Sequence, residues 1–260
     1  MNIKVLAIGD ITGKSGLDFL CKKLNEIKTE YDISFTVVNS ENSAGLGMKP
    51  KHAGVLVSAG IDVITLGNHT WTIKEIKEQL DSNPRIIRPA NFVSSMPGKG
   101  WDVYETDFGD ICVINLIGRA DMPNSYVCEN PFFEMDNILN KVKTKMILVD
   151  LHAETTSEKY AMAYYLDGRV SALWGTHTHV QTSDACIFPK GMGYITDLGM
   201  TGAVNSIIGM NPEKSLARFL GNPSSRFECA EGVAKLEGAV IEIDTITGKC
   251  INIQAIRVFE

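Results

Sequence analysis

The sequence has no long hydrophobic run. Its first apolar run, Ile3 to Ile8, stops at Gly9-Asp10, and no run reaches the ~18 apolar residues that a membrane helix needs. The same run is too short for the apolar region of a secretory signal. Both absences favour a cytoplasmic protein with no membrane-spanning segment.

Cysteine and positive charge are also scarce. The six cysteines are scattered and none forms a Cys-x-x-Cys pair, which argues against a zinc ribbon or a disulfide framework. The 25 Lys and Arg residues are outnumbered by 31 Asp and Glu residues, for a formal net charge of −6. Since a general DNA or RNA binder needs a basic surface, we expect no stable complex with a long nucleic acid.

The chain alternates short apolar runs with amphipathic stretches. Continuous runs of Val, Ile and Leu are typical of strands covered on both faces, and apolar residues spaced near 3.6 are typical of helices. The predicted strands are Ile3–Ile8, Ile33–Val38, Asp62–Leu66, Ile111–Leu116, Met146–Leu151, Val170–Trp174 and Met192–Thr196. The predicted helices are Leu17–Lys28, Lys49–Ala59, Thr72–Asp81, Phe133–Lys143 and Ser157–Leu166. This alternation predicts an α/β fold.

The end of the chain departs from this alternation. Val240–Ile243, a Thr247-Gly248 turn and Ile251–Phe259 predict a β-hairpin at the edge of a sheet. We therefore expect a sandwich of two sheets with helices outside. No linker or charge run marks a boundary, so one domain over residues 1–260 is predicted, with irregular connections at roughly 84–131 as a small cap.

Polar residues follow the ends of five predicted strands. In α/β proteins, ligands bind beyond the carboxyl ends of the strands, so we expect these side chains to converge. Four of the five histidines in the chain lie at these ends, and only His52 lies elsewhere. The candidates are Asp10, Glu41, Asn42, Asn68, His69, His152, His177 and His179.

These candidates together predict a metal site, although each has another explanation when taken alone. Asp10 could cap the next helix, and His152 could be a hydrogen-bonded structural histidine. In a continuing strand, His177 and His179 would point to the same side and reach one metal or two adjacent ones. Imidazole, carboxylate and amide ligands without cysteine favour a first-row transition metal, and the number of ligands favours two ions that share a carboxylate.

A second motif near the start of the chain points elsewhere. Gly9 to Ser15 looks like a phosphate-binding P-loop, which needs four residues between its first glycine and Gly-Lys-Ser/Thr. Only three residues separate Gly9 from Gly13. We therefore expect Lys14 to be a solvent-exposed residue in the first turn of a helix.

The joint pattern resembles the calcineurin-like metallophosphoesterases. Their strand-end motifs appear here as Gly9-Asp10, Glu41, Gly67-Asn68-His69 and Gly175-Thr176-His177-Thr178-His179. The sequence departs from the general pattern at Thr12, where a histidine is usual, at Glu41, where an Asp is usual, and at the inserted Thr176.

With these departures, the sequence is similar to the bacterial YmdB-like phosphodiesterases, and the resemblance covers essentially the whole chain. Further motifs of that subfamily are Asn39-Ser40-Glu41-Asn42, Asp150-x-His152-Ala153-Glu154, Ile195 to Gly202, Asn115 to Arg119 and Arg226-Phe227-Glu228. The resemblance implies a four-layer α/β/β/α sandwich of two mixed sheets, the metallophosphoesterase fold, and a homo-oligomer, a dimer or a tetramer.

The resemblance also implies an activity, which is hydrolysis of cyclic nucleotides, above all 2′,3′-cyclic AMP. Asp10, Glu41, Asn42 and His179 would hold one metal ion, and Glu41, Asn68, His152 and His177 would hold a second. Iron is the expected metal, and Mn or Zn would accept the same ligands. A metal-bound hydroxide would attack the phosphorus, and His69 would donate a proton to the leaving oxygen.

Two alternatives to a cyclic-nucleotide phosphodiesterase stay open at this point. One is a phosphomonoesterase or nuclease of broad specificity. The other is a regulatory module that binds a nucleotide without turning it over.

Overall fold

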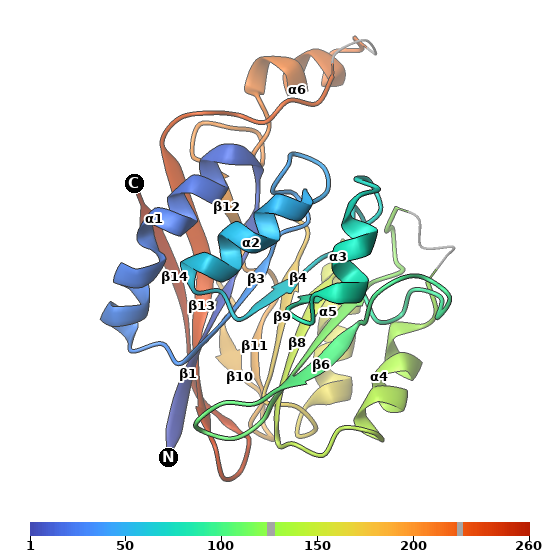
Figure 1. The fold of residues 1–260 in the computed structure, drawn as a ribbon, viewed down its shortest axis with the longest axis vertical. Coiled ribbons are helices and arrows are strands. Elements are labelled where there is room, and N and C mark those ends of the chain that lie inside the picture. The colour runs from blue at the N-terminus through green and yellow to red at the C-terminus, as the bar shows by residue number, and fades with distance from the viewer. Residues whose placement is uncertain (124–127, 223–225) are drawn as a thin grey trace.

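The computed structural model describes residues 1–123, 128–222 and 226–260, which form two β-sheets packed face to face (Figure 1). The first sheet has the order β2 (Asp10–Ile11), β12 (Met200–Ala203), β13 (Ala234–Asp244), β1 (Asn2–Ile8), β3 (Phe35–Asn39), β4 (Val63–Thr65) and β5 (Ile86–Ile87), and β14 (Cys250–Phe259) also pairs with β13. The second has the order β10 (Cys186–Ile187), β11 (Gly193–Ile195), β9 (Ala172–Thr176), β8 (Met146–His152), β7 (Ile111–Ile117) and β6 (Trp101–Tyr104).

Both sheets are mixed. In the first, β1, β3, β4 and β5 are parallel, whereas β13 runs antiparallel to β1. In the second, β7, β8, β9 and β11 are parallel, and β6 and β10 are antiparallel strands at the two ends. The predicted α/β fold with two mixed sheets is confirmed.

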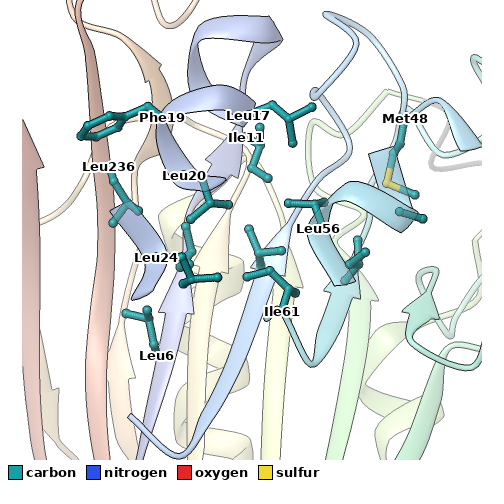
Figure 2. Close-up of a cluster of buried hydrophobic side chains, with 14 of the residues drawn as sticks. Leu6, Ile11, Leu17, Phe19, Leu20, Leu24, Met48, Leu56, Ile61 and Leu236 are labelled. Carbon is teal, nitrogen blue, oxygen red and sulfur yellow. The ribbon is translucent and has the colours of Figure 1, made fainter. Parts of the chain in front are cut away.

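The side chains of β1 alternate between two separate cores because successive residues of a strand face opposite sides. Leu6 and Ile8 pack under the helices α1 (Gly13–Tyr31) and α2 (Pro50–Ala59), together with Leu20, Leu24 and Leu56 (Figure 2). The intervening Val5 and Ala7 face the second sheet and pack with side chains such as Leu148 and Trp174. Strands buried on both faces explain the continuous apolar runs in the sequence.

The second sheet is covered on its outer face by α4 (Pro131–Leu139) and α5 (Thr156–Leu166). Met135 of α4 and Met162 of α5 pack with Val149 and Leu151 of β8. Two helical layers therefore enclose the two sheets, which is the predicted four-layer sandwich.

Several element boundaries differ from the prediction. The helix expected at Thr72–Asp81 is α3 (Ile76–Ser82), because residues 71–75 form turns. The hairpin at the end of the chain is longer than expected on its first strand, since β13 begins at Ala234. A sixth helix, α6 (Pro212–Phe219), and the short strands β2, β5, β6, β10 and β12 were not predicted.

The connections at 84–131 contain β5, β6 and β7 as well as irregular loops. Phe92, Met122 and Cys128 from these loops form a small apolar cluster with Ile117 of β7. Residues 124–127 of this range lie outside the described residues. Among the helices that the structure describes, none is long and apolar enough to cross a membrane.

The parallel strands of both sheets end at the same edge of the sandwich. The loops that follow β1, β3 and β4 of the first sheet meet the ends of β8 and β9 of the second. Direct contacts show this: the backbone N–H of His177, after β9, donates to Asp10, after β1. This edge carries all the predicted site residues.

Candidate metal centre

Glu41 is the centre of the site, and its carboxylate is fully buried. Its Oε1 lies 3.0 Å from Nε2 of His152 and accepts a hydrogen bond of 3.2 Å from Nδ2 of Asn42. Its Oε2 accepts the backbone N–H of His69 at 2.9 Å. One carboxylate therefore contacts residues from the ends of β3, β4 and β8.

On one side of Glu41, three ligand atoms surround Nε2 of His152. Besides Glu41, they are Oδ1 of Asn68 at 3.0 Å and Nδ1 of His177 at 3.1 Å. Ligand atoms at this spacing can share one ion whose ligand distances are about 2.0–2.2 Å. Among the described residues, Glu41, His152 and His177 form the one group of His, Cys, Asp and Glu with this metal-binding spacing.

A second group near Glu41 consists of Asp10, Asn42 and His179, and Oδ1 of Asp10 also lies 3.9 Å from Nδ1 of His152. Nε2 of His179 lies 3.1 Å from Nδ2 of Asn42 and 3.9 Å from Oδ1 of Asp10. Oδ1 of Asp10 and Oδ1 of Asn42 are both buried without a hydrogen-bond partner. Buried polar atoms without partners are rare and costly, so these two oxygens are the atoms that a cation would complete.

Burial and close charges shift the pKa values across the site. Burial lowers the pKa of His152, but the carboxylates of Glu41, Asp10 and Asp150 raise it to about 9, so without a cation this ring is protonated. Burial raises the pKa of Glu41, but the charge and hydrogen bond of the adjacent His152 lower it to about 2, so Glu41 is an ionised carboxylate. Burial lowers the pKa of His177 to about 3, with help from His152, so its ring is neutral. Burial raises the pKa of Asp10 to about 6. Carboxylate and neutral imidazole are the forms that bind metals, so a cation bound here would displace the proton of His152.

The ring of His152 is fixed by a chain of hydrogen bonds. Its Nδ1 lies 2.9 Å from Oγ1 of Thr176, and the Thr176 hydroxyl donates to Oδ1 of Asp150 at 2.8 Å. Since the hydroxyl proton is used on Asp150, Nδ1 of His152 is the donor and Nε2 is left facing the site. Asp150 therefore contacts His152 through the hydroxyl of Thr176 and not directly.

The other two histidines are oriented in the same way through their second ring nitrogen. Nδ1 of His179 donates to the carbonyl of Ile208 at 2.8 Å, which leaves Nε2 for the site. Nε2 of His177 lies 3.0 Å from Oε2 of Glu154, which leaves Nδ1 for the site. Such contacts fix the tautomer of metal-binding histidines and raise their basicity.

The two histidines do not continue strand β9, contrary to the prediction. The strand ends at Thr176, and His177 (φ 102°) and His179 (φ 63°) both have a left-handed backbone. This conformation is unusual for residues with a side chain. His177 contacts His152 and His179 contacts Asn42, so the two rings meet different residues of the site.

A buried ion pair holds this loop. Nζ of Lys159 lies 2.8 Å from Oδ2 of Asp197, with both side chains about 1% exposed, and also donates to the carbonyl of Thr176. The same Oδ2 accepts the backbone N–H of Thr178. The pair thus fixes the backbone on both sides of His177.

Two glycines of the motifs are explained by close packing at the site. A Cβ on Gly67 would lie 2.3 Å from the ring of His152 and 2.4 Å from Oε2 of Glu41. A Cβ on Gly175 would lie 1.9 Å from the carbonyl of Thr196. Only a residue without a side chain lets these strand ends approach so closely.

The site opens into a cavity of about 290 Å³. His69 is partly buried and lines it with Glu41, Asn42, His177 and His179. Burial lowers the pKa of His69 below its usual value, while Glu41 raises it. The cavity also has lining residues that the sequence did not predict, namely Leu46, Ile208, Met210 and Phe227.

The structure therefore brings all eight predicted residues to one edge of the sandwich. Lys14, by contrast, is exposed and pairs with Asp18 one turn along α1, as expected for a residue outside a phosphate site. Thr176 and Ile208 were missed, although Thr176 was visible as an insertion in the last motif. A carbonyl acceptor such as that of Ile208 leaves no sequence signal.

Comparisons with known proteins agree with the family resemblance of the sequence. A family model described as YmdB-like protein matches residues 6–256. The chain is 44% identical over 259 residues to the 2′,3′-cyclic-nucleotide 2′-phosphodiesterase of Bacillus subtilis (strain 168), covering 98% of this chain and 97% of that protein. The solved structure of a phosphatase from Mycoplasma pneumoniae has a TM-score of 0.94 at 37% identity, covering 100% of this chain and 94% of that one. A hypothetical protein from Thermus thermophilus has a TM-score of 0.91 at 38% identity, covering 99% of this chain and 100% of that one. The chain belongs to the YmdB-like protein family.

Proposed function

We propose that this protein is a phosphodiesterase that opens 2′,3′-cyclic nucleotides, above all 2′,3′-cyclic AMP, with two transition-metal ions. One observation carries the proposal: the buried carboxylate of Glu41 contacts both His152 and Asn42, and Asn42 in turn contacts His179, so the two groups of ligand atoms meet at this carboxylate. The activity named for the Bacillus subtilis relative, at 44% identity over nearly the whole chain, supports the choice of substrate.

These two groups support the ligand sets that the family resemblance implies. Asp10, Glu41, Asn42 and His179 would hold one ion, and Glu41, Asn68, His152 and His177 the other. Oxygen and imidazole donors without thiolate suit iron, which we expect, and also Mn and Zn. When bound, two such ions neutralise the charge of a phosphodiester and supply a nucleophilic water at neutral pH.

His69 supplies the proton in this proposal. Water adds its oxygen to phosphorus, one ring P–O bond breaks, and the departing ribose oxygen takes a proton to become a hydroxyl. His69 lines the cavity, and its backbone N–H is fixed on Glu41 at 2.9 Å, so its distance from the site is set by the metal-binding residues. A positioned proton donor of this kind contributes about 10²–10⁴-fold to the rate.

A panel of substrates tests the proposal. Purified enzyme of known metal content is assayed on 2′,3′-cyclic AMP, 3′,5′-cyclic AMP and an aryl phosphate monoester. We expect the highest kcat/KM on 2′,3′-cyclic AMP. The phosphatase name of the Mycoplasma pneumoniae structure favours a second candidate, a phosphomonoesterase. Preference for the aryl monoester would support that candidate, and tight binding without turnover would indicate a regulatory module.

A further inference from the structure

One wall of the cavity at the metal centre is apolar. Leu46, Ile208, Met210 and Phe227 form this apolar wall, and the other lining residues are polar, namely Glu41, Asn42, His69, Glu154, His177, Thr178 and His179. None of the four apolar side chains has a role in the proposed chemistry. A cyclic nucleotide has two parts that suit these two kinds of lining: an anionic phosphate for the polar residues and a flat, largely apolar base for the apolar wall.

Phe227 is the most prominent residue of this wall. The residue is 54% exposed although it lines the cavity, so part of its surface is open to solvent. The guanidinium carbon of Arg218, at the end of α6, lies 4.1 Å from the centre of the ring. Arg218 thus covers one face of the ring, and the exposed area leaves the ring open on another side.

The backbone holds Phe227 beside the metal centre. The segment that follows it pairs with the loop at 209–211: the N–H of Asn211 donates to the carbonyl of Glu228, and the N–H of Ala230 donates to the carbonyl of Gly209. Met210 and Cys229 form a β-bridge between the two segments. Phe227 therefore belongs to the same packed unit as Ile208 and Met210.

Ile208 connects this unit to the metal centre. It has a left-handed backbone (φ 46°), which is a marked outlier for a β-branched residue, and its side chain is 48% exposed. Its carbonyl accepts the hydrogen bond from Nδ1 of His179 at 2.8 Å. Strained residues of this kind persist where the surrounding structure requires them, often at binding sites.

We propose that Phe227, with Leu46, Ile208 and Met210, is the binding surface for the base of the nucleotide, and that the base stacks on the open side of the Phe227 ring. The inference rests on the proposed function, since it names the part of that substrate that this wall holds. Stacking of a base on an aromatic ring is strong and tolerates any base, because every base has a flat π-face. The wall therefore distinguishes nucleotides from phosphodiesters without a base.

The test of base binding combines a variant that lacks the Phe227 ring with a substrate that lacks the base. The full-length enzyme and its Phe227→Ala variant are assayed on 2′,3′-cyclic AMP and on the 2,3-cyclic phosphate of methyl riboside, which has no base. We expect Phe227→Ala to raise KM for 2′,3′-cyclic AMP roughly 10-fold and to leave KM for the base-free substrate within about twofold. Phe133→Ala is the matched control, because Phe133 is an exposed phenylalanine of α4 that does not line the cavity. Equal effects of Phe227→Ala on both substrates, or no effect on either, would overturn the inference.

A binding measurement separates this inference from the proposed function. In Phe227→Trp, we expect adenosine monophosphate to quench the fluorescence of the new tryptophan, and ribose phosphate to leave it unchanged. Wild-type protein gives the background from its three tryptophans. Quenching by the nucleotide in a protein without cyclic-nucleotide turnover would support base binding while the proposed function fails. The same fluorescence with and without adenosine monophosphate would contradict base binding, whatever the enzyme hydrolyses.

Discussion

The hydroxyl of Thr176 lies 2.9 Å from Nδ1 of His152. The same hydroxyl donates a hydrogen bond to Asp150. Asp150 is fully buried and also accepts hydrogen bonds from Asn39 and Thr65. Burial raises the pKa of Asp150, and these donors oppose the shift. The strand ends of both sheets are thus connected through one buried carboxylate behind the candidate metal centre.

Thr176→Val should weaken metal binding without unfolding the protein, because valine keeps the shape of threonine but cannot accept the proton of His152. Loss of such a contact behind a metal ligand typically costs 10–100-fold in metal affinity. Competition with a chelator measures it. Thr176→Ser, which keeps the hydroxyl, should stay close to wild type, and equal metal affinity in all three proteins would refute the role of the hydroxyl.

His69→Ala should separate metal binding from catalysis. The hydrogen bond of His69 to Glu41 comes from its backbone N–H, which alanine retains. We expect near wild-type metal content and a kcat lower by about 10²–10⁴-fold. Elemental analysis and steady-state kinetics on 2′,3′-cyclic AMP measure the two quantities. A variant that loses its metal would show that His69 is itself a ligand.

Gly67→Ala should damage the site through size alone. The new methyl group would overlap the side chains of Glu41 and His152, which are fully buried. Overpacking of this kind costs about 1–3 kcal/mol and should reduce metal content. Gly54→Ala in α2 is the control, since a Cβ there meets no atom within 4 Å. It should be neutral or stabilising by about 0.5–1 kcal/mol, as alanine is a better helix former; destabilisation by the control alone would contradict the packing argument.

His52, the histidine outside the site, should make stability depend on pH. Its ring is buried, Nδ1 lies 2.9 Å from Oγ of Ser43, and burial with Lys51 and Lys49 lowers its pKa below 6.5. The unfolded chain then binds a proton at a higher pH than the folded chain, so the neutral form stabilises above pH 6.5 and this stability is lost as the pH falls. Urea unfolding at pH 7.5 and pH 5 should show a larger loss for wild type than for His52→Gln. Identical losses would mean that His52 is not the group responsible.

The sequence predicts the parts of the fold that have a strong hydrophobic pattern. Strands such as β1 and β8 are buried on both faces, and helix α1 has a clear apolar face, so both kinds of element are visible in the order of residues. β12 was missed, because its four residues Met200–Ala203 include a glycine and have no alternation. Its place in the sheet depends on pairing with the distant β2 and β13.

Helix α6 was missed for a different reason. Its start is marked in the sequence by Asn211, which caps the N–H of Lys214, and by Pro212 at the first position. Its apolar residues do not point to a core, since Phe219 is 83% exposed and only Ser215 of this helix is buried. Local signals for a helix were present, but the burial pattern that gives such signals weight was not.

The residues of the candidate site were more predictable than the hydrogen bonds that orient them. Strand ends and motif order placed the eight residues together, and the family resemblance is confirmed. The orientation of the rings was not predictable, because it depends on contacts between residues far apart in sequence, such as His179 with Ile208 and His152 with Thr176. The left-handed backbone at His177 also has no sequence signal.

The most direct test of the central claim is an anomalous diffraction map of crystals of the purified protein. Two ions that share the carboxylate of Glu41 predict two peaks about 3.5–4 Å apart, one beside His152 and His177 and one beside Asp10 and His179. A single peak, or peaks remote from Glu41, would contradict a paired metal centre at this edge of the sandwich.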